Sequence, residues 1–149
     1  MATDIQIADI SHAPAITRLS REALGYDYPE AATAENLASI LESPGDRVFV
    51  ALIQGEVVGY VHACDYQVLY APAMKNIMGI AVDASHRREG IGTALLTAVE
   101  NWAQQSGAAG VRLVSGASRA QAHLFYRSLG YGDGRQQRNF KKYFQGISE

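Results

Sequence analysis

The feature that most constrains the fold is a strand, a glycine loop and a long amphipathic helix in direct succession. Residues 76–82, NIMGIAV, have the apolar and β-branched character of a buried strand, and the loop DASHRREG follows them. From about Gly92 onward, apolar residues recur at helical spacing, namely Leu95, Leu96, Val99 and Trp102. Such a succession is typical of α/β proteins.

The remaining segments extend this pattern along the whole chain. Helical spacing predicts a helix between Pro14 and Gly25, and a second helix that Thr33 would cap. The other expected elements are strands at 47–53, 57–66 and 111–115, a helix at 120–129 and a last strand at 136–144. We therefore predict a single α/β domain over 1–149, with a mixed central sheet flanked by helices on both faces.

Composition excludes several classes of protein. A formal net charge of −2 argues against nucleic-acid or anionic membrane partners, and no apolar run approaches the roughly 18 residues of a membrane helix. The N-terminus has no basic segment followed by an apolar one, which argues against a signal peptide. Cys64 is the only cysteine, which fits a reducing compartment. We expect a cytoplasmic protein.

The loop before the long helix has the features of an anion site. A helix N-terminus presents unpaired N–H groups, glycine lets a ligand approach the backbone, and Arg87 and Arg88 supply forked donors. A P-loop is excluded because no lysine follows Gly92. A dinucleotide fingerprint is excluded because Leu95 stands where its third glycine belongs.

Two segments resemble the signatures of the GCN5-related N-acetyltransferase (GNAT) superfamily. Residues 87–92, RREGIG, are similar to its Arg/Gln-x-x-Gly-x-Gly/Ala pyrophosphate loop, and residues 122–131, AHLFYRSLGY, resemble its tyrosine helix. The expected order of elements is also that of the superfamily. The resemblance implies acetyl-coenzyme A as co-substrate. No spacing of histidine, cysteine and aspartate suggests a metal site, so we expect none.

The resemblance also implies which residues hold the co-substrate. Backbone groups of Ile80, Ala81 and Val82 would line the pantetheine arm, and Thr93 lies in the first helical turn. The pyrophosphate would be held by the loop residues Arg87, Arg88, Glu89, Gly90, Ile91 and Gly92. Arg119 replaces an asparagine that many members use, so it could reach a phosphate or a substrate, or only cap a helix.

The implied reaction is attack of an amine on the acetyl thioester, through a tetrahedral intermediate, with a thiolate leaving. Tyr126 matches the family tyrosine that hydrogen-bonds or protonates the leaving sulfur, and a phenol with a pKa near 10 stays protonated at working pH. Core packing beside Phe125 is the alternative for this ring.

The base that many members carry is missing. The strand at 76–82 contains no acid and no histidine, so we expect water or the acceptor's own ionisation to supply the neutral amine. His62 and Asp65, on the preceding strand, are the alternatives. Cys64 lacks the context of a nucleophile, and a Cys-His-Asp set of His62, Cys64 and Asp65 is not expected because adjacent strand residues point to opposite faces.

The acceptor has no readable motif. We expect a small-molecule amine rather than a protein N-terminus or lysine, and a non-catalytic acyl-CoA-binding module is the alternative of a different class. A second copy of the chain as partner stays open. Tyr26, Asp27, Tyr28, Tyr66 and Tyr70 could form an aromatic, slightly acidic pocket or lie on the surface.

Overall fold

The computed structural model describes residues 2–147 and divides the chain into two compact units, residues 1–114 and 115–149. The helices of the first unit are η1 (Ile10–His12), α1 (Ala13–Leu24), α2 (Glu30–Glu42), η2 (Ala84–His86) and α3 (Ile91–Gln105). Its strands are β1 (Asp4–Ile7), β2 (Asp46–Ile53), β3 (Glu56–Tyr66), β4 (Met74–Val82) and β5 (Val111–Leu113). The second unit contains α4 (Ala120–Ser128).

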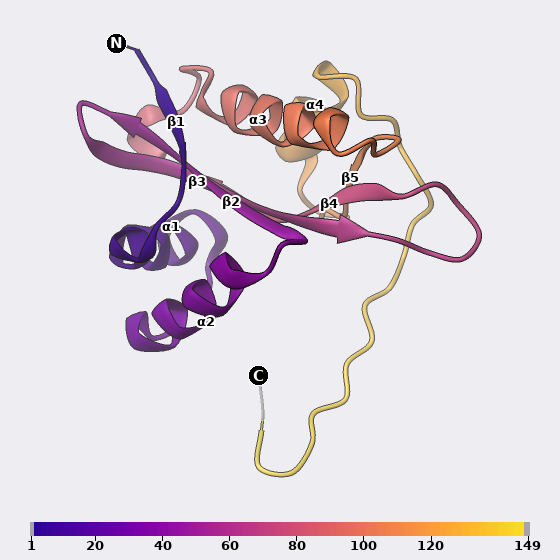
Figure 1. The fold of residues 1–149 in the computed structure, drawn as a ribbon, viewed down its shortest axis with the longest axis horizontal. Coiled ribbons are helices and arrows are strands. Elements are labelled where there is room, and N and C mark those ends of the chain that lie inside the picture. Colours follow the sequence, from indigo (N-terminus) through magenta and orange to yellow (C-terminus); the bar gives the residue numbers. More distant parts are fainter. Residues whose placement is uncertain (1, 148–149) are drawn as a thin grey trace. The chain divides into compact units, whose positions relative to one another are not determined.

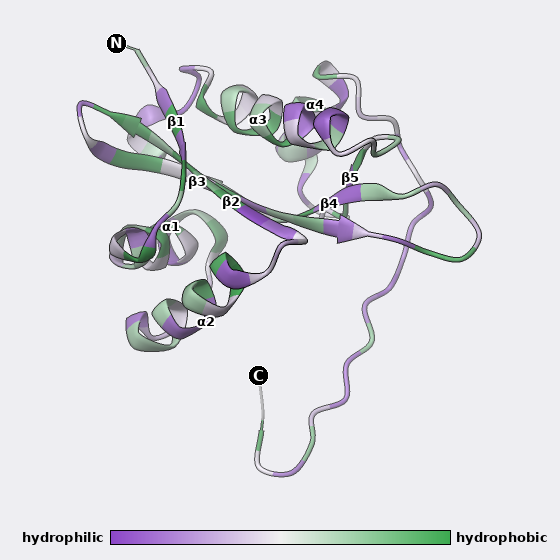
Figure 2. Ribbon diagram, in the orientation of Figure 1, coloured by the Kyte–Doolittle hydropathy of each residue, from purple (hydrophilic) through white to green (hydrophobic). Residues whose placement is uncertain are grey.

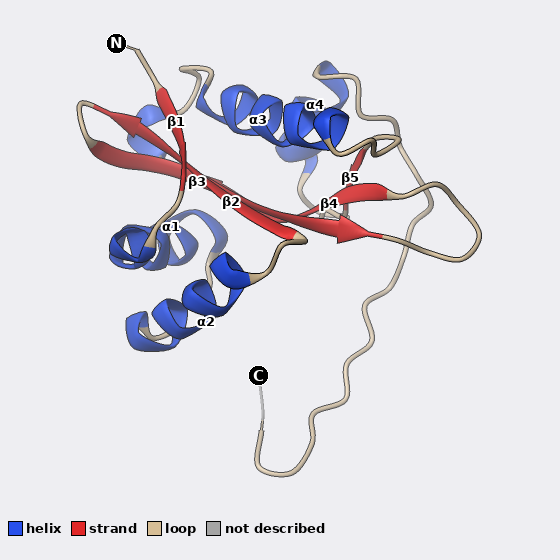
Figure 3. Cartoon of the chain, in the orientation of Figure 1, coloured by secondary structure: helices blue, strands red, loops and turns tan. Residues whose placement is uncertain are grey.

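The sheet of the first unit is mixed and follows the order of the sequence, β1-β2-β3-β4-β5 (Figure 3). Strands β1 to β4 pair antiparallel, and β5 runs parallel to β4 because the chain returns through α3. A bulge between His62 and Ala63 shifts the β3–β4 register. The expected α/β class with a mixed central sheet is confirmed.

Helices cover the two faces of this sheet. Figure 1 shows α1 and α2 on one face and α3 on the other. Val48, Val50 and Tyr60 face the first side and join a buried cluster with Leu19 and Leu37 of the two helices. These apolar strands form the green centre of the sheet in Figure 2.

The packing on the α3 side explains one glycine in β3. A Cβ on Gly59 would lie 3.1 Å from the Ile91 side chain and 3.2 Å from that of Leu95, so a larger residue would push α3 away from the sheet. Leu95 and Leu96 are fully buried, and each such leucine stabilises the fold by about 1.5–3 kcal/mol. The helix that follows the glycine loop is thus anchored firmly.

The local signals placed most helices correctly. Gly25 ends α1 in a left-handed conformation, with φ of 78°, as expected. The expected cap of α2 is wrong: the helix begins at Glu30, and Thr33 lies inside it with its hydroxyl donating to the Pro29 carbonyl at 3.1 Å. No helix among the described residues has the length and apolar character needed to cross a membrane.

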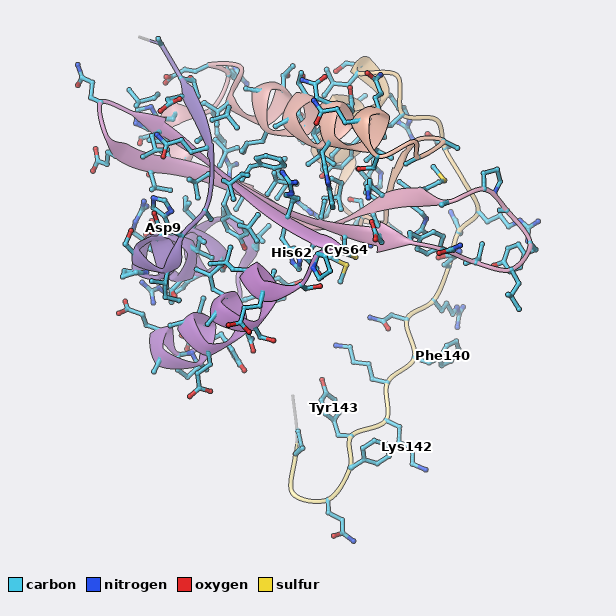
Figure 4. All side chains as sticks on the ribbon, in the orientation of Figure 1. Asp9, His62, Cys64, Phe140, Lys142 and Tyr143 are labelled. Atoms are coloured by element: carbon cyan, nitrogen blue, oxygen red, sulfur yellow. The ribbon has the colours of Figure 1, made fainter. Side chains whose placement is uncertain are left out.

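Two strand predictions were wrong. Strand β1 was missed because DIQI is a short, largely polar edge strand. Residues 136–144 form no strand, and Figure 4 shows Phe140, Lys142 and Tyr143 on a segment without regular structure. Phe140 is 88% and Phe144 76% exposed. An alternating pattern alone does not make a strand when no neighbour in residues 2–147 pairs with it.

Candidate active site

Strand β4 has an open edge over its second half. It pairs with β5 only at Lys75–Ile77, so residues 78–82 have no strand partner on that side in the described chain. The Asp83 N–H donates to the Val58 carbonyl of β3 at 2.8 Å. Because backbone groups alternate along a strand, Ala81 turns its own toward β3, whereas Ile80 and Val82 turn theirs to the open edge.

The loop after β4 ends in a helix N-terminus without a side-chain cap. Gly90 precedes α3 with φ of 81°, a left-handed conformation that favours glycine. Its carbonyl accepts the first helical hydrogen bond, from Ala94 at 3.0 Å. The amides of Ile91, Gly92 and Thr93 therefore precede any intrahelical acceptor and point out of the helix end.

The arginines of this loop carry no ion pair within residues 2–147. Arg87 and Arg88 are exposed, and Arg88 has a φ of 66°, a left-handed conformation that a non-glycine residue seldom adopts. Glu89 lies 3.3 Å from the ring of His86 and is not paired with either arginine. Free helical amides and two unpaired guanidinium groups provide the N–H donors and the positive charge that bind a pyrophosphate.

Tyr126 and Arg119 belong to the second unit. Tyr126 is the buried residue of α4, and it stacks obliquely on Phe125 and edge-on to Tyr131. Burial raises its pKa above the ordinary 10.0, and the charge of Arg119 acts weakly in the opposite direction. His123 is engaged with the Gly116 carbonyl at 2.9 Å.

The second unit also begins with an unsatisfied polar group. The hydroxyl of Ser115, two residues after β5 ends, is buried and has no hydrogen-bond partner among residues 2–147. Buried hydroxyls are normally satisfied, so this oxygen calls for a ligand or water. No sequence signal had singled out Ser115.

The two alternative bases lie on opposite faces of the sheet. His62 Nε2 is 2.7 Å from Asp46 Oδ1, a contact that sequence reasoning missed because it joins two strands. Burial opposes ionisation of Asp46, but hydrogen bonds from His62 and Ser43 outweigh it and lower its pKa. Asp65 instead pairs with Lys75 on the α3 side.

Cys64 lies on the same face as His62, the side of the sheet that carries α2 (Figure 4). Burial raises the pKa of its thiol, and the charges of Asp46 and Asp65 raise it further. A thiol held protonated is a poor nucleophile, so electrostatics oppose a catalytic cysteine, and strand alternation places Asp65 on the opposite face from Cys64.

The aromatic residues considered for an acceptor pocket do not act as one set. Tyr26, Tyr28 and Tyr70 are exposed, whereas Tyr66 carries the Arg112 guanidinium at 4.0 Å from its ring centre. Within residues 2–147, no group of three or more histidine, cysteine or acidic side chains is placed to hold a metal ion.

Comparison with known proteins agrees with these features. The acetyltransferase (GNAT) family model matches residues 13–131. No curated protein matches the chain significantly by sequence.

Solved structures of aminoglycoside acetyltransferases share the fold. AAC(6')-Iy with a bisubstrate analogue has a TM-score of 0.85 at 20% identity, over 97% of this chain and 100% of that chain. AAC(6')-Ih from Acinetobacter baumannii has a TM-score of 0.84 at 18% identity, over 96% of this chain and 99% of that chain. An aminoglycoside acetyltransferase from an uncultured soil metagenomic sample has a TM-score of 0.78 at 25% identity, over 96% of this chain and 97% of that chain. The chain thus belongs to the GNAT acetyltransferase family, as an acetyl-CoA-dependent N-acetyltransferase.

Proposed function

We propose that the chain transfers the acetyl group of acetyl-CoA to the primary amine of a small molecule. The observation that carries this proposal is the uncapped N-terminus of α3, flanked by two unpaired arginines and following directly on a strand with an open edge. Residues 1–149 act as one functional domain in this proposal, which is supported by a family match that extends across both compact units.

The first unit supplies the co-substrate's binding groups. The amides of Ile91, Gly92 and Thr93, with Arg87 and Arg88, would hold the pyrophosphate. Glu89 and Gly90 complete the loop, because Glu89 pairs with His86 and Gly90 supplies the turn into the helix.

The open edge of β4 would bind the pantetheine amides. Ile80 and Val82 turn N–H and C=O groups outward, and Ala81 keeps the strand in register through its pairing with Tyr60. The family's co-substrate supplies an activated acetyl thioester when it is bound.

Tyr126 is proposed as the proton donor to the leaving sulfur. Its raised pKa keeps the phenol protonated over the working range. A thiol has a pKa near 8.5, so a neutral phenol can hydrogen-bond the sulfur as negative charge develops there. Arg119 is the N-cap residue of α4 and is proposed to contact the co-substrate.

The neutral amine is proposed to come from water or from the acceptor's own ionisation. Strand β4 offers no acid or histidine, and Asp65 is held by Lys75 on the α3 side of the sheet. One ring nitrogen of His62 is already bonded to Asp46. The acid–base groups nearest in sequence are thus engaged in pairs.

A small-molecule acceptor is favoured over a protein because similar folds carry that activity. Several solved structures with this fold are those of aminoglycoside acetyltransferases. A direct test combines calorimetry of acetyl-CoA with thiol release in the presence of small amines and of lysine-containing peptides. We expect binding, and thiol release with small amines. Absence of binding, or release with peptides alone, would contradict the proposal.

A further inference from the structure

A row of four residues crosses the sheet on the side that carries α1 and α2. In the strand register, Asp46 of β2 faces Cys64 of β3, Cys64 faces Asn76 of β4, and Asn76 faces Arg112 of β5. Directly paired residues project to the same face, so these side chains form one polar strip. The strip ends at β5, where β4 and β5 are about to separate.

The face is open beside this strip. Met78, which follows the last paired residue of β4, is 58% exposed. Gly79 stands opposite His62, and a Cβ built on it would meet no atom within 4 Å. A small molecule therefore has room on this face next to the open edge of β4.

The charges along the strip are not balanced. Asp46 is paired with His62, whereas Arg112 has no carboxylate partner within residues 2–147. Instead, one guanidinium nitrogen of Arg112 donates to Asn76 Oδ1 at 2.6 Å, and the group lies over the Tyr66 ring. The strip thus keeps a cation without an internal counter-ion.

The same contacts hold the guanidinium in place. A neutral amide and an aromatic face fix its plane without neutralising its charge, and Arg112 is half-buried, so screening by water is reduced. A guanidinium has five N–H donors, so an oxyanion can still be bound by the donors that Asn76 leaves free. This is the arrangement of a receptor for a carboxylate or phosphoryl oxygen.

We infer that Arg112 binds an anionic group of the acceptor, so that the preferred acceptors are primary amines carrying a carboxylate, phosphate or phosphonate. The inference rests on the proposed acetyl transfer and deepens it. It also distinguishes this chain from enzymes of polycationic acceptors, for which an unpaired arginine on the acceptor face would be repulsive.

Matched acceptors provide the test. Thiol release is measured with β-alanine and β-alaninamide, with aminoethylphosphonate as the phosphoryl arm and neamine as the polycationic arm. We expect kcat/KM at least about tenfold higher for the acids than for the amide or neamine, the effect of one charge-assisted contact.

Two variants assign the preference to Arg112. Arg112→Gln removes the charge, and Asn76→Asp places an internal carboxylate where Asn76 Oδ1 already accepts from Arg112. Each should bring the acid-to-amide ratio close to one while leaving acetyl-CoA affinity unchanged. Arg47→Gln, which removes a cation over Trp102 on the α3 side, is the matched control and should keep the wild-type ratio.

The outcomes separate the inference from the proposed function. Preference for the amide or neamine in the wild type, or an unchanged acid-to-amide ratio in both Arg112→Gln and Asn76→Asp, overturns the role of Arg112 while leaving acetyl transfer intact. A wild type that transfers to none of the amines overturns the proposed small-molecule function, and this inference with it.

Discussion

The two halves of β4 offer ligands different chemistry. In the first half, residues 75–77 lie between β3 and β5, so their backbone is paired and only side chains are available. The second half, residues 78–82, lacks a partner on one edge and offers backbone groups instead. Backbone groups suit the amides of an extended arm that every reaction uses, whereas side chains can differ with the acceptor. In our proposals, one strand thereby separates co-substrate binding from acceptor selection.

The largest expected effect involves a residue outside both halves. Tyr126→Phe removes the hydroxyl and keeps the ring, so kcat should fall about 10²-fold or more, the usual lower range for a general acid. The KM values of both substrates should change little. Steady-state kinetics with both substrates varied would check this. An unchanged kcat in Tyr126→Phe would show that Tyr126 only packs in the core.

The loop that follows the second half of β4 is tested by co-substrate affinity. Gly92→Val places a branched side chain among the free amides of α3, and we expect the Kd of acetyl-CoA to rise by more than about tenfold. Arg87→Glu should raise it less, because the amides remain. Circular dichroism verifies the fold of each variant. An unchanged Kd in both variants would show that the loop does not bind the co-substrate.

The base is tested by pH dependence. If the acceptor's own ionisation supplies the neutral amine, kcat/KM should rise with pH toward the acceptor's pKa, and the rise should move when two acceptors differ by about two pKa units. Because burial raises the pKa of Tyr126, its ionisation should cause no loss of activity below about pH 10.

The same proposal predicts small effects at the two alternative bases. His62→Ala and Asp65→Ala should each lower kcat less than about tenfold, short of the 10²–10⁴ of a general base. If the pH profiles of kcat/KM rise at the same pH with both acceptors, and this rise disappears in His62→Ala, the Asp46–His62 pair is the base instead.

The smallest expected effect is that of Lys75, a cation of the sheet that serves as a comparison with Arg112. Lys75 lies 4.0 Å from the centre of the Trp102 ring and pairs with Asp65, so it stabilises the fold. Lys75→Ala should lower the free energy of unfolding by about 1 kcal/mol, mostly from the lost stacking, because Asp65 is largely exposed. Acceptor preference should not change. Urea unfolding and the acid-to-amide ratio measure the two effects, and a changed ratio would place Lys75 in the site.

Sequence reasoning succeeded where the signal is local. The glycine loop, the start of α3 and the end of α4 depend on residues within a few positions of each other, such as Gly90 and Gly130, and could be predicted. The contacts between Asp46 and His62 and between Asn76 and Arg112 could not. They depend on the register of β2 against β3 and of β4 against β5, which no short motif encodes.

The separation of the proposed co-substrate loop from Arg112 is tested most directly without any knowledge of the acceptor. Acetyl-CoA is titrated by calorimetry into the wild type, Arg87→Glu and Arg112→Gln. The account predicts a Kd raised severalfold or more in Arg87→Glu, because a binding guanidinium becomes a repulsive carboxylate, and an unchanged Kd in Arg112→Gln. Equal Kd values in all three proteins, or a raised Kd in Arg112→Gln alone, would contradict this prediction.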